Sequence, residues 1–149
     1  MEKTKKSTRK TGSKASEEKL IASYVEFVLT NGKRPPSVYK FCLDLGIKEE
    51  EFYNYVGSFS GLEKLIWKGF IDKVIGRLQA DDTFPGFTVR EKILVFYYSL
   101  LEELKKHRSY ILFQLENSRK PEITPEYITL FKSAFESFME NILQEGKGT

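Results

Sequence analysis

Few side chains in this sequence are suited to act as a nucleophile, a general base or a metal ligand. The chain has one cysteine, Cys42, and one histidine, His107. Cys42 has no second cysteine for a disulfide or a metal site and falls on an apolar helical stripe, so we interpret it as a packing residue. His107 lies in a basic run near an expected helix end, where cations complement the helix dipole. We therefore predict no catalytic residue, metal site or cofactor, and a protein that is not an enzyme.

The strongest concentration of charge is a basic segment at the start of the chain. Residues 1–14, MEKTKKSTRKTGSK, hold six Lys or Arg and one Glu, which gives +5 and leaves −2 for the rest of a chain whose total is +3. No apolar residue beyond Met1 interrupts the segment, so we expect a disordered basic tail over residues 1–15. Two interpretations stay open: a solvated tail that aids solubility, or an arm that binds phosphates or a minor groove.

Residues 37–62 are predicted to form two short helices joined by a glycine turn, followed by the start of a third helix. Apolar residues at positions 38, 41, 42 and 45 share one helical stripe, and Ser37 stands at the N-cap position. Gly46 follows, where a residue with positive φ can end a helix. In the next helix Phe52 and Val56 are inward anchors. This is the layout of a helix-turn-helix, whose second helix enters the major groove of DNA.

Three consecutive carboxylates, Glu49, Glu50 and Glu51, lie mainly on the outer face of that second helix. A carboxylate roughly 6 Å from a phosphate is repelled by about 0.7 kcal/mol in bulk water and by about 3 kcal/mol at the effective dielectric of a protein surface. Glutamate can accept from cytosine N4, so one of the three can read a base, although a run of three is not explained in that way. Residues 16–65 hold six Lys or Arg and eight Asp or Glu, a net charge of −2.

The same segment resembles the recognition region of the TetR family of bacterial transcriptional regulators. The hydrophobic skeleton, Gly46, Tyr53 and Tyr55 match the family pattern. The polar positions differ, because Lys48 replaces a capping serine and Phe59 replaces a phosphate-contacting lysine. The corresponding stretches here are Phe41-Cys42, Gly46-Ile47-Lys48, Phe52-Tyr53-Asn54-Tyr55-Val56, Ser58-Phe59-Ser60 and Leu62.

The resemblance implies a set of DNA-binding residues in this chain. Tyr53 and Tyr55 correspond to residues that contact the DNA backbone, and Asn54 corresponds to a possible base contact. Ser37 begins a helix whose backbone N–H groups can face a phosphate, as helix N-termini do in general. Lys33 and Arg34, in the connector before that helix, are candidate phosphate contacts or solvated loop charges, and the role of Lys48 is left open.

Helix signals cover most of the chain and strand signals are nearly absent, so we predict an all-α, TetR-like fold. Ser16, Ser58 and Thr88 are expected helix caps. We expect a helix-turn-helix domain at 16–60 and a helical sensor and dimerisation region at 61–149. About seven helices are predicted, at roughly 16–31, 37–45, 47–56, 58–80, 88–104, 110–115 and 125–142.

Aromatic side chains are frequent in the second half of the chain. One interpretation is that some of them line a pocket for a small apolar ligand whose binding shifts the reader helices. The other is that aromatics at helical spacing simply fill a core, which is the more common case for any single residue. The candidate pocket residues are Trp67, Phe70, Tyr97, Tyr110, Phe113 and Phe135.

The resemblance also implies two further helices that form most of a family homodimer. The glycine-containing segment 144–149 resembles the turn that precedes them, so we expect the sensor region to be incomplete at its C-terminal end. The chain has no apolar signal core and no stretch near the ~20 apolar residues of a membrane span, so we expect a cytoplasmic protein with no membrane partner.

Two functional hypotheses follow. The first is a bacterial regulator, such as a repressor, that binds operator DNA through the helix-turn-helix and responds to a small apolar ligand. The second is a TetR-like scaffold that has lost operator binding and acts as a protein- or ligand-binding module. The acidic run at positions 49–51 favours the second, while Gly46, Tyr53, Tyr55 and the basic tail favour the first.

Overall fold

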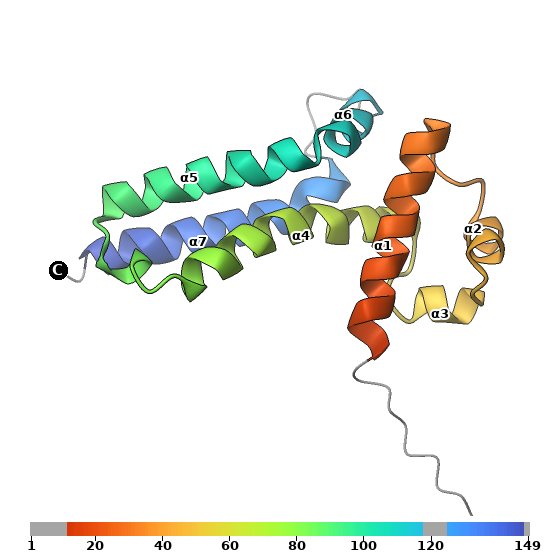
Figure 1. Cartoon of the computed structure of the whole chain (residues 1–149), viewed down its shortest axis with the longest axis horizontal. Helices are drawn as coiled ribbons and strands as arrows, with labels where there is room; N and C mark the ends of the chain where they lie inside the picture. The colour runs from red at the N-terminus through yellow and green to blue at the C-terminus, as the bar shows by residue number, and fades with distance from the viewer. Residues whose placement is uncertain (1–11, 118–124, 148–149) are drawn as a thin grey trace, which may run out of the picture. The chain divides into compact units, whose positions relative to one another are not determined.

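The computed structural model describes residues 12–117 and 125–147, and all regular secondary structure in these ranges is helical (Figure 1). The predicted all-α fold is confirmed. The elements are α1 (Gly12–Asn31), α2 (Val38–Leu45), α3 (Glu49–Tyr53), α4 (Phe59–Ala80), η1 (Phe84–Gly86), α5 (Val89–Lys106), α6 (Arg108–Glu116), η2 (Glu126–Ile128) and α7 (Thr129–Lys147), where η denotes a 3-10 helix.

The chain divides into two compact units between Gly57 and Ser58. The first unit contains α1, α2 and α3, and the second contains α4 to α7 with both 3-10 helices. Each unit has buried apolar side chains of its own, and each is described separately below.

Phe41 holds the first unit together. It is buried on α2, and its ring lies edge-on to Tyr24 of α1 and Phe52 of α3, with centroid distances of 6.1 and 6.3 Å. Edge-to-face pairs at this spacing add to the stabilisation that comes from burying the rings. Leu20 and Val28 extend the buried face of α1 at helical spacing.

In the second unit α4, α5 and α7 pack against one another along their lengths (Figure 1). Apolar residues recur on the inner faces of these helices at helical spacing, which is the pattern expected of a helical bundle. The buried core residues are Ile71, Val74, Leu78, Phe84, Phe96, Leu100, Phe138 and Ile142.

The caps predicted for α4 and α5 are confirmed. Ser58 Oγ accepts the backbone N–H of Gly61 at 3.1 Å. Thr88 and Glu91 form a reciprocal capping box, in which each side chain accepts the backbone N–H of the other residue. Such caps satisfy N–H groups that have no partner within the helix, and they fix where the helix begins.

Glu103 is a buried carboxylate surrounded by cations. Its side chain is 2 % exposed, and its oxygens lie 2.9 Å from Arg77 Nη2, 3.4 Å from Lys106 Nζ and 3.9 Å from Lys73 Nζ. His107 Nε2 lies 3.3 Å away, and its ring stacks on Phe70 at a centroid distance of 4.5 Å. Burial by itself raises the pKa of Glu103, but the hydrogen bonds from His107 and Lys106 and the nearby positive charges outweigh it and lower the pKa.

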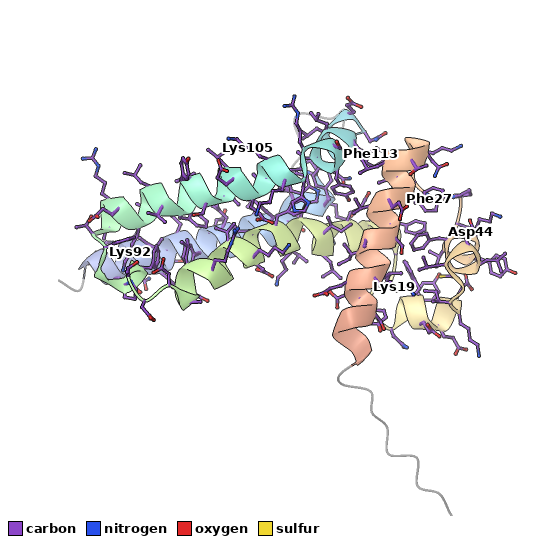
Figure 2. All side chains as sticks on the ribbon, in the orientation of Figure 1. Lys19, Phe27, Asp44, Lys92, Lys105 and Phe113 are labelled. Atoms are coloured by element: carbon purple, nitrogen blue, oxygen red, sulfur yellow. The ribbon has the colours of Figure 1, made fainter. Side chains whose placement is uncertain are left out.

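α7 extends further than the sequence predicted. The expected turn at 144–149 is wrong for residues 144–147, which continue the helix to Lys147. Two contacts stabilise this last turn. Glu145 accepts from the buried Lys92 Nζ at 2.7 Å, and Gly146 packs so closely on Val89 that a Cβ at position 146 would overlap its side chain. Lys92 lies near the start of α5 (Figure 2).

The predicted start of the first helix is also wrong. α1 begins at Gly12, so Ser16 lies inside the helix and does not cap it. The residues around it include Lys, Ala and Glu, which propagate a helix readily, and no proline interrupts them. Residues 12–15 of the expected tail therefore belong to α1, and residues 1–11 lie outside the described part of the chain.

No helix among the described residues is both long enough and apolar enough to cross a membrane.

We expect Glu103→Gln to lower the free energy of unfolding by about 1–3 kcal/mol, because it removes hydrogen bonds to a charged group in a buried position. The folded-state pKa of Glu103 is lowered, so its stabilisation is complete above the usual carboxyl pKa of about 4.3 and is lost as the pH falls through the folded-state value. Urea unfolding between neutral and acid pH measures both effects.

The matched control is Glu136→Gln, since Glu136 is 63 % exposed and makes a 3.9 Å pair with Lys132 on the same helix. It should change stability by less than about 0.5 kcal/mol and keep the acid dependence of the wild type. Equal effects of the two substitutions would show that the cations around Glu103 do not stabilise the unit.

Candidate nucleic-acid interface

The link between α2 and α3 has the geometry of a helix-ending Schellman turn. Gly46 adopts φ 75° and ψ 27°, which is the left-handed region. The N–H of Ile47 donates to Cys42 O at 3.0 Å, and the N–H of Gly46 donates to Leu43 O at 3.2 Å. These two bonds satisfy carbonyls at the end of α2, and they fix the direction in which the chain enters α3. The predicted role of Gly46 is confirmed.

α2 begins as predicted. Ser37 is its N-cap, and the Ser37 Oγ accepts the backbone N–H of Lys40 at 3.0 Å. Ser37 is exposed at the start of the helix, and Lys33 and Arg34 of the preceding connector are exposed as well. These three predicted residues are thus all exposed and lie within five positions of sequence at the start of α2.

α3 is short and lacks a side-chain cap. Lys48 occupies the N-cap position without making a side-chain hydrogen bond to the helix. Glu49, Glu50 and Glu51 fill the first turn, where negative charge interacts favourably with the positive end of the helix dipole. The acidic run therefore stabilises a five-residue helix that has no cap.

The other predicted contact residues lie at the end of α3 and just after it. Tyr53 is 52 % exposed, and its ring rests edge-on against the buried Phe52 at 5.4 Å. Asn54 is the exposed C-cap of the helix, and Tyr55 is partly buried. Tyr53 and Asn54 are thus available to a ligand, whereas much of Tyr55 contributes to packing.

Cys42 is 1 % exposed on the inner side of α2. Burial raises the pKa of its thiol, and the negative charges of Glu49 and Glu51 raise it further. A thiol that stays protonated and buried is unreactive, which fits the packing role inferred from the sequence.

The predicted pocket residues fall into two groups of ring contacts within the second unit. Trp67, Phe70, Tyr110 and Phe113 form one continuous series, with centroid distances of 5.6, 6.4 and 6.3 Å between successive rings. Tyr97 and Phe135 contact each other at 5.8 Å, and Tyr97 is 46 % exposed. The first group lies on α4 and α6, and the second on α5 and α7.

A buried polar series beside the first ring group was not anticipated from the sequence. Tyr110 Oη donates to Gln114 Oε1 at 2.8 Å, and Gln114 Nε2 donates to Glu63 Oε2 at 3.2 Å. The side chains of all three are at least 95 % buried. Among the described residues, the buried Trp67 Nε1 has no hydrogen-bond partner. A polar residue on an apolar helical stripe, as Glu63 is beside Leu62 and Ile66, was the only sequence signal for this arrangement.

His107 caps the C-terminal end of α5, as the sequence predicted, and contacts Glu103 and Phe70. In the part of the chain that the structure describes, no three His, Cys, Asp or Glu side chains come together as a metal-binding group.

Residues 92–149 match a family model described as the tetracyclin repressor-like, C-terminal domain. No curated protein and no solved structure was found to match the chain. The family match lies entirely in the second unit. The helix-turn-helix assignment of the first unit therefore rests on its own sequence and geometry.

We expect Gly46→Ala to destabilise the protein by roughly 1–2 kcal/mol, because an L-residue is strained in the left-handed conformation observed there. Gly76→Ala is the matched control. Gly76 lies within α4, and no atom lies within 4 Å of the position that an added Cβ would take, so alanine should stabilise the helix by up to about 1 kcal/mol. Chemical denaturation of both variants tests the turn, and an unchanged stability for Gly46→Ala would contradict the assigned geometry.

Proposed function

We propose that the chain is a TetR-like transcriptional regulator that binds double-stranded DNA through α2 and α3, and the match of residues 92–149 to a tetracyclin repressor-like C-terminal domain supports this proposal. The observation that carries this proposal is the turn at Gly46. It joins a Ser37-capped helix to a second helix that exposes Tyr53 and Asn54. A family match in the second unit and a helix-turn-helix geometry in the first are independent, and both favour the same function.

We assign the contacts by chemistry. Lys33, Arg34 and the start of α2 at Ser37 contact phosphates, as cations and helix N-termini do. The Tyr53 and Tyr55 hydroxyls donate to backbone oxygens, and the Asn54 carboxamide reads a base edge. Lys48 is placed at the start of α3 beside the acidic turn, where it offsets part of the negative charge that faces DNA.

The acidic first turn of α3 favours a second candidate function, a TetR-like scaffold that binds a protein or a ligand and no longer reads an operator. Glu50 and Glu51 are exposed, and carboxylates at this position repel phosphates. The basic segment at residues 1–11 carries five Lys or Arg against Glu2. If the protein is a DNA-binding regulator, this basic segment attracts phosphates and so compensates for the acidic first turn of α3.

We further propose that the second unit binds a small apolar ligand near Trp67. The ring series on α4 and α6, in which Trp67, Phe70 and Tyr110 are buried, supplies apolar contacts. The Glu63–Gln114–Tyr110 series supplies directional polar groups. Binding sites of this kind combine mostly apolar walls with a few placed polar groups. We propose that the protein is a non-enzymatic regulator in the bacterial cytoplasm, where the genome is accessible, and that it forms a homodimer.

DNA binding is tested by fluorescence anisotropy against a duplex from the region upstream of the protein's own reading frame and a scrambled duplex of equal length. We expect selective binding that Tyr53→Phe weakens about 3- to 10-fold, the effect of one lost hydrogen bond. Tyr98→Phe is the matched control, because Tyr98 is an exposed tyrosine on α5 and loses the same hydroxyl. Equal affinity for the two duplexes, together with no loss of affinity in Tyr53→Phe, would contradict operator recognition.

Replacing Glu49, Glu50 and Glu51 together by glutamine separates the two candidate functions. If α3 reads bases with these residues, selectivity between the two duplexes should fall. In a scaffold, only the nonspecific affinity should rise. Removal of residues 2–11, which leaves α1 intact, should make the log–log salt slope shallower by about 4 to 5 if all five cations contact phosphates.

Ligand binding is tested by the emission of Trp67, the only tryptophan in the chain. Apolar compounds that bind beside its ring should change the emission in a saturable way, and Phe113→Ala on α6 should weaken their binding. Leu115→Ala, at an exposed position of the same helix, is the control. A panel of apolar compounds that leaves the emission unchanged would contradict the proposed site, with no consequence for DNA binding.

A further inference from the structure

The indole N–H of Trp67 is a buried hydrogen-bond donor without an acceptor. Trp67 is 5 % exposed, and among the described residues its Nε1 has no hydrogen-bond partner. A buried donor that is left unpaired costs free energy, so such groups are uncommon in native proteins. An acceptor atom that reached this N–H would therefore stabilise the folded protein.

Aromatic rings surround the Trp67 indole. Tyr127 of η2 lies at a centroid distance of 5.2 Å and an interplanar angle of 30°, and Phe70 of α4 lies at 5.6 Å. Phe131 of α7 is nearly perpendicular to the indole at 6.0 Å. The face of an aromatic ring offers an N–H only a weak contact. The rings thus provide apolar contacts to the indole and no acceptor comparable to oxygen.

The nearby polar side chains bond to one another. Glu63 lies four residues before Trp67 on α4, and both side chains are buried, so they are neighbours on one face of the helix. Gln114 donates to Glu63 at 3.2 Å and accepts from Tyr110 at 2.8 Å. Trp67 Nε1 takes part in neither bond. A molecule that pairs with the indole N–H must therefore bring its own acceptor.

A carbonyl oxygen is the acceptor that suits this position. It has two lone pairs and carries no proton. A hydroxyl group would add a donor that needs a buried partner of its own, and a carboxylate would need a cation. The cation next to η2 is Lys64, which already pairs with Glu126 at 2.9 Å. The surroundings of Trp67 therefore favour a neutral carbonyl group over a hydroxyl group or an anion.

We propose that the ligand of the second unit is an apolar compound with a neutral carbonyl group, such as a ketone or an ester, whose oxygen accepts from Trp67 Nε1. This inference rests on the ligand binding proposed above and narrows it to a chemical class. The rings contact the apolar body of the ligand, and the indole N–H fixes its orientation, which is the usual division of labour in such sites.

Acetophenone and ethylbenzene test the proposal, because they share a carbon skeleton and differ in the carbonyl oxygen. Calorimetric titration of the full chain measures the affinity for each. Transfer out of water by itself favours the hydrocarbon. We nevertheless expect acetophenone to bind about fivefold more tightly or better, the effect of one hydrogen bond to a buried donor. Phenylacetate, which carries a carboxylate, should bind more weakly than acetophenone.

The possible failures of this experiment are distinguishable. Binding of ethylbenzene as tight as that of acetophenone would overturn the carbonyl class and leave an apolar ligand site in place. Tighter binding of phenylacetate would overturn the choice of a neutral group. If none of the three compounds binds, both the ligand site and this inference are overturned.

The indole N–H supplies a second, direct measurement on the wild-type chain. Because the chain has one tryptophan, its indole gives a single signal in a nitrogen–proton correlation spectrum. Acetophenone should move the indole proton downfield, as a new hydrogen bond does, and ethylbenzene should not. A bound acetophenone that leaves this proton unshifted would overturn the proposal.

Trp67→Phe removes the N–H and keeps an aromatic ring. It should abolish the preference for acetophenone over ethylbenzene, while Leu115→Ala, at an exposed position of α6, should keep it. Circular dichroism checks that both variants fold. A folded Trp67→Phe variant that keeps the full preference would contradict the assigned contact.

Discussion

Gly46 turns the chain between α2 and α3 in a left-handed conformation, and the placement of every candidate DNA contact on α3 follows from this turn. The two backbone bonds across it fix where α3 starts, and Phe41 packs between Tyr24 and Phe52 to hold the three helices of the unit in register. Replacing Gly46 by an L-residue would strain this turn, and it would therefore displace Tyr53 and Asn54 together. Local backbone geometry and a small aromatic core therefore determine where the candidate contact residues lie.

The charges in the first turn of α3 affect both its stability and the DNA binding that we propose for it. A five-residue helix without a side-chain cap needs negative charge in its first turn, and Glu49, Glu50 and Glu51 supply it. The same charges oppose a phosphate backbone. The proposed regulator resolves this conflict by taking its attraction for phosphates from the connector before α2 and from the basic segment at the start of the chain.

Several features that depend on a few neighbouring residues were predictable from the sequence, although the cap expected at Ser16 was wrong. The caps at Ser37, Ser58 and Thr88 and the turn at Gly46 are of this kind, because each is set by hydrogen bonds within a single turn. The family resemblance, noted first in the recognition region, is supported by a match in the other unit.

Features that depend on which helices meet were not predictable. The cations around Glu103 come from two helices, and the buried Lys92 meets Glu145 across 53 positions of sequence. The same pair, with the close approach at Gly146, carries α7 beyond its expected end. Tyr97 occurs at helical spacing with apolar residues, so the sequence predicts that it lines a pocket. In the structure, however, its side chain is 46 % exposed.

Backbone amide NMR of the labelled chain titrated with duplex DNA tests most directly whether the α2–α3 unit itself contacts DNA. We expect the largest shift changes on residues 33–40 and 48–55, with smaller changes on α5 and α7. Changes confined to residues 1–11, or spread evenly over the chain, would contradict this expectation and leave an electrostatic tail on a helical scaffold as the better description.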